Sequence, residues 1–490
     1  MGRVIGIDLG TTTSEIAYIE NGKPKLIPDI YGDTIIPSIV AEKENEIIVG
    51  RMAYNQLLSN PEKTISEIKC LIGSKERIKL GNQRYLPHEI SSIILQELKN
   101  YAEKFIGEEV EEAIITVPAN FDSKQRELTK LAGEVAGFKV ERIINEPTAA
   151  AIGYGIDNLQ KNEKLLVYDL GGGTFDVTIL EMVDGVLDVV SSRGNNKLGG
   201  KNFDERIERY IDEEFKEQYG VYLSETDVDY TKIKPRLKEA AINAKKELSS
   251  NLRTTINIPF ITSINNKNVD LNIELSRAKF DEITLDLVNS TTDTINEVLK
   301  AAKCSEDDID IVLLVGGASR IVSVQNLLYK LFQKKVKLGI NPDELVALGA
   351  AVQAGIKNNE IRKEKAITVK DKCSYNLGTR IVGEVDGQLV DGLFDCLIPI
   401  DSDLPSSYKK IYKTVYDNQK SIAVDVYEGN EPLVHDNTKV GYFILQGIPE
   451  GPAGSEEIEI EFNYDLNGIL QVNAKVLSTG EEVRKVINRL

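Results

Sequence analysis

Two stretches of sequence, DLGTTTSEIAY at residues 8–18 and DLGGGTFDVTIL at residues 169–180, repeat one pattern. In each copy an aspartate ends an apolar run, small residues follow, and a second strand-like run begins. Asn-Gly after the first copy and Asp-Gly after the second favour the primed turn of a β-hairpin. The distance between the copies far exceeds the period of about 20–50 residues that is typical of solenoids. The duplication therefore predicts two related lobes that face each other.

The repeated turns have the chemistry of a phosphate site. Glycines at these positions let backbone N–H groups close around phosphate oxygens. Because carboxylates repel phosphate, we expect Asp8 and Asp169 to hold a hydrated magnesium ion between the lobes. Two other phosphate-binding motifs are absent. A P-loop built on Gly200 and Lys201 would need a glycine at position 195, where the sequence has Asn195. A dinucleotide-binding motif that begins at Gly171 would need a glycine at position 176, where the sequence has Asp176. One copy alone could be a plain hairpin turn, but the duplication disfavours that interpretation.

A third glycine turn follows the apolar run at residues 309–315. Gly316 and Gly317 come before a predicted helix, and a helix N-terminus with small residues suits an anion or a nucleotide sugar. Arg320 is placed to lie against a purine face. Close packing of the strand against the helix is the alternative explanation of these glycines.

The composition excludes several classes of function. A chain of 490 residues is too long for one core, so we expect two or three domains. The net charge of -18 argues against binding to nucleic acid. Two histidines and four widely spaced cysteines argue against a histidine triad, a zinc site and a disulfide framework. There is no signal-peptide pattern and no run long enough to span a membrane, so we expect a cytoplasmic protein without a membrane partner.

The apolar periodicity and the composition of the sequence change near residue 358. Before it, apolar periodicity predicts helices at residues 124–137, 203–219 and 278–304 among strands, which indicates an α/β domain over residues 1–358. Residues 359–373 are polar and charged, as in a linker or an edge segment. Residues 374–490 alternate in short runs between turns, which predicts an all-β sandwich.

The segments DLGTTTS, DLGGGTFDV, LVGGASRI and RIINEPTAAAIGYG closely resemble the DnaK-type heat-shock chaperone family. The resemblance covers the ATPase domain nearly completely and extends through the β domain. It implies a two-lobed actin-like ATPase domain followed by a β sandwich that binds peptides. The implied function is that of an ATP-dependent molecular chaperone, in which slow ATP hydrolysis controls the binding of extended apolar segments of unfolded proteins. J-domain co-chaperones and nucleotide-exchange factors are the further partners that the resemblance implies.

The resemblance also assigns candidate catalytic residues. Lys69 matches the family's catalytic lysine, whose ammonium neutralises charge on the transferred phosphoryl group and orients water. A solvated helix charge is the alternative interpretation of this lysine. Glu146 resembles a carboxylate that couples metal and water to domain communication, and Asp176 resembles a second water-ordering carboxylate. The full catalytic set is Asp8, Lys69, Glu146, Asp169, Thr174 and Asp176, and its metal-holding members are Asp8 and Asp169.

The implied cofactor is ATP or ADP with Mg2+, and K+ is a further candidate cation. The phosphate-binding turns that match the family are Gly10, Thr11, Thr12, Thr13, Gly171, Gly172, Gly173 and Thr174. The other candidate nucleotide-binding residues are Gly199, Gly200, Lys245, Lys246, Ser249, Gly316, Gly317, Arg320 and Asp343.

Four positions depart from the family pattern. Ile242 stands where a ribose-binding glutamate is usual, and Cys70 stands where an arginine usually follows the catalytic lysine. Ala318 replaces a common serine, and Thr13 takes a position that tyrosine often fills. Loss of a hydrogen bond to ribose weakens nucleotide binding by about 1–2 kcal/mol, so we expect weaker retention of ADP than is usual for the family.

Two residues and one segment bear on communication between the domains. Pro118 and Arg126 match residues that relay the nucleotide state, although a strand end and a helix position explain them equally well. The family's linker is rich in leucine, whereas AITVKDKCSYNLG at residues 366–378 contains lysines. We expect that such a segment cannot dock apolar side chains in the same way.

The β domain carries a candidate peptide pocket. Ile422 matches its centre, and its neighbours are Tyr412, Val415 and Val424. Ordinary inward-facing strand residues are the alternative interpretation, because periodicity alone does not separate the two. No helical lid is expected after the last strand.

Two rival classes of function remain open. A metabolic actin-like kinase would transfer phosphate to a small molecule rather than to water, and it leaves the β domain unexplained. A non-catalytic nucleotide-dependent scaffold would fit the departures at Ile242 and Cys70. The retained Lys69, Glu146 and Asp169 argue against that scaffold.

Overall fold

Two mixed sheets have the same strand order, as the sequence duplication predicts. The computed structural model describes residues 3–155, 161–337, 341–361, 367–385 and 387–487. In each sheet, three strands form an antiparallel meander and two more join in parallel. In the first sheet they are β3 (Lys23–Ile27), β2 (Thr13–Glu20), β1 (Arg3–Leu9), β10 (Val110–Val117) and β11 (Lys139–Asn145). In the second they are β14 (Val186–Asn195), β13 (Phe175–Val183), β12 (Glu163–Leu170), β17 (Ile311–Val315) and β18 (Val336–Lys337). We call the parts built on these sheets the first and second lobes.

Two helices, α4 (Glu146–Gly155) and α10 (Leu345–Lys357), lie between the two sheets and join the lobes. Their alanines pack with apolar residues of both sheets in one buried core. The helices approach each other so closely that a Cβ added to Gly349 would lie 1.7 Å from the carbonyl oxygen of Ala149. Only glycine fits there, because any side chain would collide with the backbone of the neighbouring helix.

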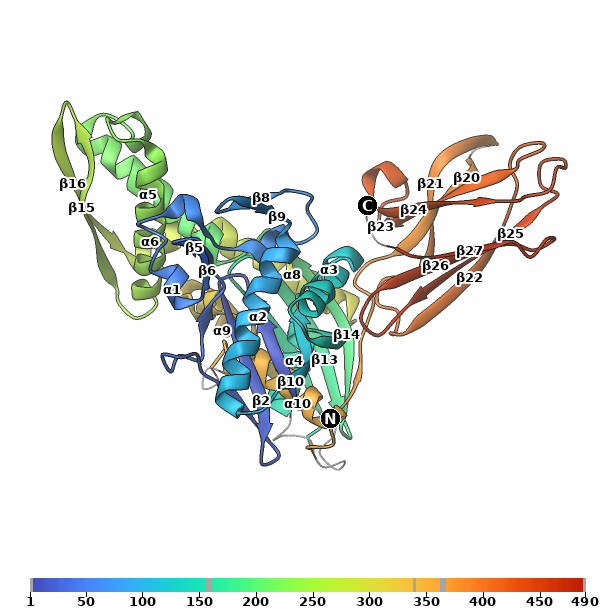
Figure 1. Cartoon of the computed structure of the whole chain (residues 1–490), viewed down its shortest axis with the longest axis horizontal. Coiled ribbons are helices and arrows are strands. Elements are labelled where there is room, and N and C mark those ends of the chain that lie inside the picture. The colour runs from blue at the N-terminus through green and yellow to red at the C-terminus, as the bar shows by residue number, and fades with distance from the viewer. Residues whose placement is uncertain (1–2, 156–160, 338–340, 362–366, 386, 488–490) are drawn as a thin grey trace.

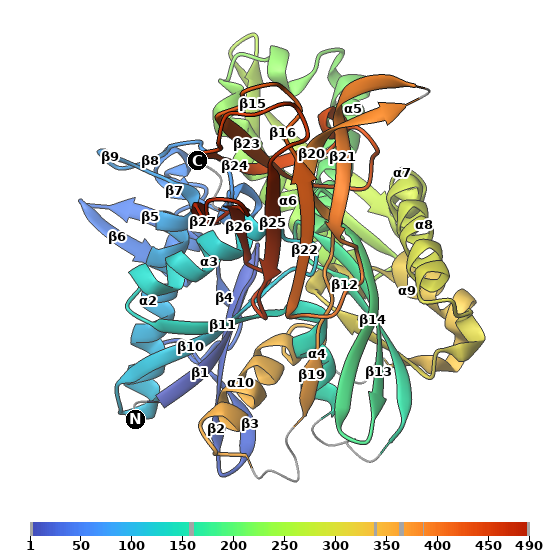
Figure 2. The ribbon, with the colours of Figure 1, turned by 90° about the vertical axis from the view of Figure 1, so that its right-hand side faces the viewer.

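The outer faces of the sheets are covered by further helices (Figures 1 and 2). On the first lobe these are α2 (Pro87–Ile106) and α3 (Ser123–Val135). On the second they are α5 (Gly200–Tyr219), α6 (Tyr230–Leu248), α7 (Arg277–Ile283), α8 (Leu285–Ala301) and α9 (Val322–Phe332). Smaller elements are α1 (Arg51–Tyr54), β4 (Ile36–Pro37), β5 (Val40–Lys43), β6 (Glu46–Val49), β7 (Thr64–Ile65), β8 (Ile78–Leu80), β9 (Gln83–Tyr85), β15 (Arg253–Ile264) and β16 (Lys267–Ser276). Within the described ranges, no helix is both long and apolar enough to cross a bilayer.

The helix expected at residues 278–304 is in fact two helices, which corrects that prediction. The break between α7 and α8 falls at Thr284, whose backbone φ of -114° and ψ of 5° lie outside the helical region. The Thr284 hydroxyl donates a hydrogen bond of 2.7 Å to the carbonyl oxygen of Phe280. Such a back bond slightly destabilises and often bends a helix, although the Thr284 backbone N–H still donates to the Phe280 carbonyl oxygen at 3.2 Å, and a local bend leaves the apolar periodicity unchanged.

The C-terminal part consists of two four-stranded antiparallel sheets, which lie beside the lobes in Figure 1. The first has the order β21 (Gln388–Ile398), β20 (Leu377–Val385), β23 (Ser421–Glu428) and β24 (Thr438–Gln446). The second has the order β22 (Ser406–Lys413), β25 (Glu457–Tyr464), β26 (Leu470–Val476) and β27 (Glu482–Val486). Alternate residues of both sheets point into one shared apolar core, as the period of two requires.

The segment that joins the two parts is docked on the second lobe. Within it, β19 (Thr368–Lys370) pairs in parallel with β14 and forms the edge of the second sheet. Val369 packs on the core between the lobes, whereas the Lys370 side chain is exposed. The segment therefore docks through main-chain pairing, which does not depend on leucine side chains. That it docks its apolar side chains differently from the family's leucine-rich linker stays a prediction.

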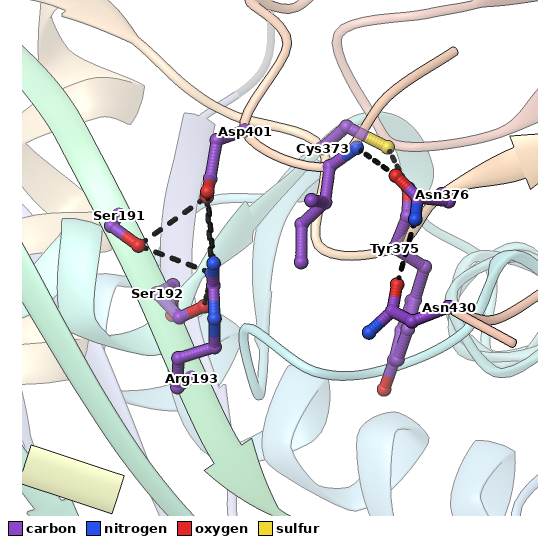
Figure 3. Close-up of polar contacts among 9 residues, drawn as sticks. Ser191, Ser192, Arg193, Cys373, Tyr375, Asn376, Asp401 and Asn430 are labelled. Atoms are coloured by element: carbon purple, nitrogen blue, oxygen red, sulfur yellow. Dashed lines mark hydrogen bonds and ion pairs between the residues drawn. The ribbon is translucent and has the colours of Figure 1, made fainter. Parts of the chain in front are cut away.

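Polar side-chain contacts fasten the joining segment and the C-terminal part to both lobes. Arg193 on β14 and the Asp401 carboxylate form a two-pronged ion pair at 2.9 and 3.1 Å (Figure 3). The Asn145 amide donates to both oxygens of the buried Asp371 at 2.8 and 2.9 Å. The Ser123 hydroxyl donates to Glu428 at 2.8 Å.

Candidate functional site

A cavity of about 580 Å3 lies between the two lobes and is lined by both repeated turns and by the Gly316 turn. The predicted residues that line it are Asp8, Gly10, Thr11, Thr12, Thr13, Lys69, Glu146, Asp169, Gly171, Gly172, Thr174, Gly200, Lys245, Lys246, Ser249, Gly316, Gly317, Arg320 and Asp343. Three predicted residues, Gly173, Gly199 and Asp176, do not line it. The structure thus brings together residues that lie far apart in the sequence, from Asp8 to Asp343.

The two repeated turns come within contact of each other, which explains their small residues. A Cβ added to Gly172 would lie 2.2 Å from the Thr12 hydroxyl oxygen. A Cβ added to Gly199 would lie 2.5 Å from the backbone nitrogen of Gly173, so Gly199 supports the second turn from behind. Both Gly173 and Gly199 therefore shape the turn at residues 171–174 without lining the cavity.

Asp8 and Asp169 are the next-to-last residues of β1 and β12, so the two sheets present them at matching positions. The Thr116 hydroxyl donates to the Asp8 carboxylate at 2.8 Å. Burial, together with the charge of Glu146, raises the pKa of Asp8 to about 7. Burial and the neighbouring carboxylates also raise the pKa of Asp169 well above its ordinary value. A divalent cation would relieve this concentration of negative charge, so the donor set fits Mg2+.

Lys69 is buried in the 3-10 turn at Ile68–Leu71 and forms an ion pair of 2.5 Å with Glu146. Its ammonium lies 5.8 Å from the centre of the Phe121 ring. Burial opposes the positive charge, but Glu146 and Asp8 outweigh it and raise the pKa of Lys69. A side chain that is 4% exposed is not a solvated helix charge, so that alternative is excluded.

Asp176 lies behind the cavity rather than in its wall. It faces Asp169 in the register of β12 and β13, and the Asn120 amide donates to its carboxylate. Burial raises the pKa of Asp176 to about 6. Its position suits a group that acts on the site through neighbours or water more than one that touches a phosphate.

Glu15 is a site residue that the sequence interpretation missed. It lines the cavity and is 2% exposed. The register of β1 and β2 places it opposite Asp8, as Asp176 lies opposite Asp169. The duplication contained this signal, because continuing the alignment from Asp8 and Asp169 along the second strand pairs Glu15 with Asp176.

Two of the other candidate nucleotide-binding residues in the cavity wall, Lys245 and Arg320, are held by ion pairs. The Lys245 ammonium forms an ion pair of 2.7 Å with the buried Asp204, which the sequence interpretation also missed. Arg320 forms an ion pair of 2.8 Å with Asp343, which holds the guanidinium at the cavity edge. Ile242 lines the cavity too, so an apolar side chain faces the space where the resemblance leads one to expect a carboxylate.

The two candidate relay residues lie at the interface with the C-terminal sheets. Arg126 is buried, and its guanidinium donates to the carbonyl oxygens of Phe121 and Ala119 at 3.0 and 2.8 Å. A Cβ added to Gly468 would lie 2.9 Å from the Arg126 side chain, so the backbone between β25 and β26 packs directly on it. Pro118 is buried directly after β10, in the loop that leads to α3 and contains Ala119 and Phe121.

The four candidate peptide residues do not share one environment. Val424 is buried in the core between the C-terminal sheets, as an ordinary inward-facing strand residue is. Tyr412 and Ile422 lie half-buried at the margin of that core. The Tyr412 hydroxyl donates to Asp395 at 2.7 Å, and Val415 lies half-buried in the loop after β22.

A comparison with known families agrees with this geometry. The family described as "Hsp70 protein" matches residues 4–489, which include both lobes and both C-terminal sheets.

Proposed function

Because the chain belongs to the Hsp70 family, whose members are ATP-dependent chaperones with a two-lobed actin-like ATPase fold, we propose how its own residues perform this function. The cleft between the lobes binds and hydrolyses ATP, and hydrolysis controls the capture of extended apolar segments by the C-terminal β sandwich. The observation that carries the proposal is the convergence of Asp8, Asp169 and the Lys69–Glu146 pair on one cavity beside two glycine turns.

The backbone N–H groups of the turns at residues 10–13 and 171–174 bind the phosphates. Asp8 and Asp169 would hold Mg2+, which supplies positive charge to the phosphate oxygens when it is bound. Lys69 stabilises negative charge on the transferred phosphoryl group and orients the attacking water, while Glu146 holds its ammonium in place.

A short path connects the β domain with the catalytic cleft. The Tyr375 hydroxyl donates to the Asn120 carbonyl oxygen at 2.6 Å, and the Asn120 side chain donates to Asp176. Pro118 and Arg126 frame the same loop. We propose that displacement of the β sandwich shifts this loop and, through Asp176, the water-ordering groups of the site. Domain boundaries near residues 358 and 374 place the docked strand β19 within the linker.

The test is single-turnover ATP hydrolysis with and without an unfolded peptide centred on leucine. Lys69→Ala is expected to slow hydrolysis by roughly 100-fold to 1000-fold, the usual loss for removing one group that stabilises the transition state. Lys75→Ala is the matched control, because Lys75 is exposed and does not line the cavity.

The outcomes separate the alternatives. Acceleration by peptide of a Lys69-dependent hydrolysis supports the coupled chaperone. Hydrolysis that ignores peptide removes the coupling and leaves the ATPase. Transfer of phosphate to a small molecule would identify a kinase, and nucleotide binding without any turnover would identify a scaffold.

A further inference from the structure

Five cationic side chains line the cleft, and they differ in their partners. Three are paired with carboxylates at 2.5–2.8 Å: Lys69 with Glu146, Lys245 with Asp204 and Arg320 with Asp343. Among the cavity-lining residues that the structure describes, Lys201 and Lys246 have no carboxylate within ion-pair distance. The Lys201 ammonium instead contacts the sulfur of Cys70 at 3.5 Å.

The backbone fixes Lys201 beside the second phosphate turn. Its N–H donates to the carbonyl oxygen of Gly172 at 2.9 Å, and the N–H of Gly200 donates to Gly171 at 2.9 Å. These bonds attach the first turn of α5 to the turn at residues 171–174. The lysine therefore keeps its position relative to the glycines that we propose as the phosphate cradle.

Cys70 approaches the same turn from the first lobe. A Cβ added to Gly173 would lie 2.6 Å from the Cys70 sulfur. The contact between Lys201 and Cys70 thus spans the cleft from the second lobe to the first. A thiol is a weak acceptor for an ammonium group that has three strong donors, so Lys201 retains unused bonding capacity toward the cavity.

We propose that Lys201 is a phosphate-binding cation of this cleft, an inference that rests on the proposed nucleotide function. When a nucleoside polyphosphate binds, the Lys201 ammonium exchanges the Cys70 sulfur for a phosphate oxygen. A charge-assisted N–H to oxygen bond of about 2.7–2.9 Å is much stronger than the contact to sulfur. The flexible four-carbon stem lets the ammonium move while the backbone stays attached to Gly172. Lys201 thereby supplies positive charge beside position 70, where the thiol supplies none.

The experiment compares binding of adenosine, ADP and ATP with Mg2+ to the wild type and three variants. Lys201→Gln is expected to weaken ADP and ATP binding by roughly tenfold or more, the usual loss for one hydrogen bond to a charged group. Adenosine binding stays within about twofold of wild type, because adenosine has no phosphate. Lys201→Arg retains most of the ADP affinity. Lys197→Gln is the control, because Lys197 is exposed and does not line the cavity.

Unchanged ADP and ATP affinity in Lys201→Gln overturns the inference and leaves the proposed function intact. An equal loss of adenosine, ADP and ATP also overturns it, because it indicates a structural role. If the wild type binds none of the three ligands, the proposed function itself fails, and the inference fails with it. Thermal melting of each variant verifies that it is folded.

Discussion

Glu15 lies directly opposite Asp8 in the antiparallel register of β1 and β2, and both side chains line the cleft. The first lobe therefore presents two facing carboxylates where the second lobe presents Asp169 and Asp176. The exposed fraction of Glu15 is 2%, so little water reaches its carboxylate. Facing carboxylates in a buried site destabilise each other's ionised forms.

Glu15→Gln is expected to stabilise the protein at neutral and alkaline pH. Burial and the charge of Asp8 raise the pKa of Glu15 well above its ordinary value of 4.5. The folded state therefore binds this proton more tightly than the unfolded chain does. The stability that this bound proton contributes is fully present below the pKa of Glu15 in the unfolded chain. It is lost as the pH rises through the pKa of Glu15 in the folded protein. Glutamine does not ionise and avoids this loss.

The measurement is thermal melting of wild type and Glu15→Gln without nucleotide from about pH 5 to about pH 8. The gain in melting temperature should widen with pH and reach roughly 2–4 °C for each kcal/mol recovered. Glu46→Gln serves as the control, because Glu46 is exposed on β6. A gain that is the same at every pH would contradict the argument from ionisation.

Because Lys69 and Glu146 form a buried ion pair, we expect that the stability lost in a Lys69 variant can be partly restored without restoring hydrolysis. Lys69→Ala leaves the Glu146 carboxylate buried without its partner, which typically costs about 3–5 kcal/mol of unfolding free energy. Adding Glu146→Gln removes that uncompensated charge, so the double variant should regain part of the stability while hydrolysis stays lost. Denaturant unfolding and single-turnover hydrolysis of the same preparations provide the comparison. A double variant no more stable than Lys69→Ala would show that the unpaired carboxylate is not the source of the loss.

Much of this architecture could be predicted from local chemistry. Asn21 and Asp184 adopt the positive φ angles that the primed turns need, so both hairpins follow from a few adjacent residues. The contact of Lys201 with Cys70 could not be predicted, since it joins residues from different lobes and has no periodic signature. The break between α7 and α8 could not be predicted for a different reason, because the backbone angles change at the single residue Thr284 and the apolar pattern continues across it.

We expect that a substitution at Ile242 can increase the affinity for ADP. Its apolar side chain lines the cleft on α6, and it offers no acceptor for a hydroxyl group. Ile242→Glu is expected to tighten ADP binding by roughly tenfold, because a hydrogen bond to a charged group contributes about 1.5–3 kcal/mol. Isothermal calorimetry of ADP against wild type, Ile242→Glu and Ile242→Gln measures this. Weaker binding of ADP to the glutamate variant would contradict the prediction and indicate that repulsion from the phosphates dominates.

The ion pair between Arg193 and Asp401 offers a direct test of communication between the domains. It joins β14 of the second lobe to the C-terminal part and lies outside the cavity lining (Figure 3). Arg193→Asp should reduce the stimulation of hydrolysis by peptide while basal hydrolysis stays near the wild-type rate. The effect on the docking equilibrium is modest, about 1 kcal/mol, because both side chains are partly exposed to water.

Exchange of the two charges distinguishes the pair from its surroundings. The double variant Arg193→Asp with Asp401→Arg restores an attraction across the same interface, so peptide stimulation should return toward the wild-type value. Hydrolysis rates with and without peptide in the two single variants and the double variant form a cycle that isolates the pairwise contribution. If both single variants lose stimulation and the double variant recovers none of it, the interface acts through shape or the Ser191 contact rather than through this pair. Full stimulation in the single variants would instead place the control of coupling elsewhere, at Asn145 with Asp371 or at Tyr375 with Asn120.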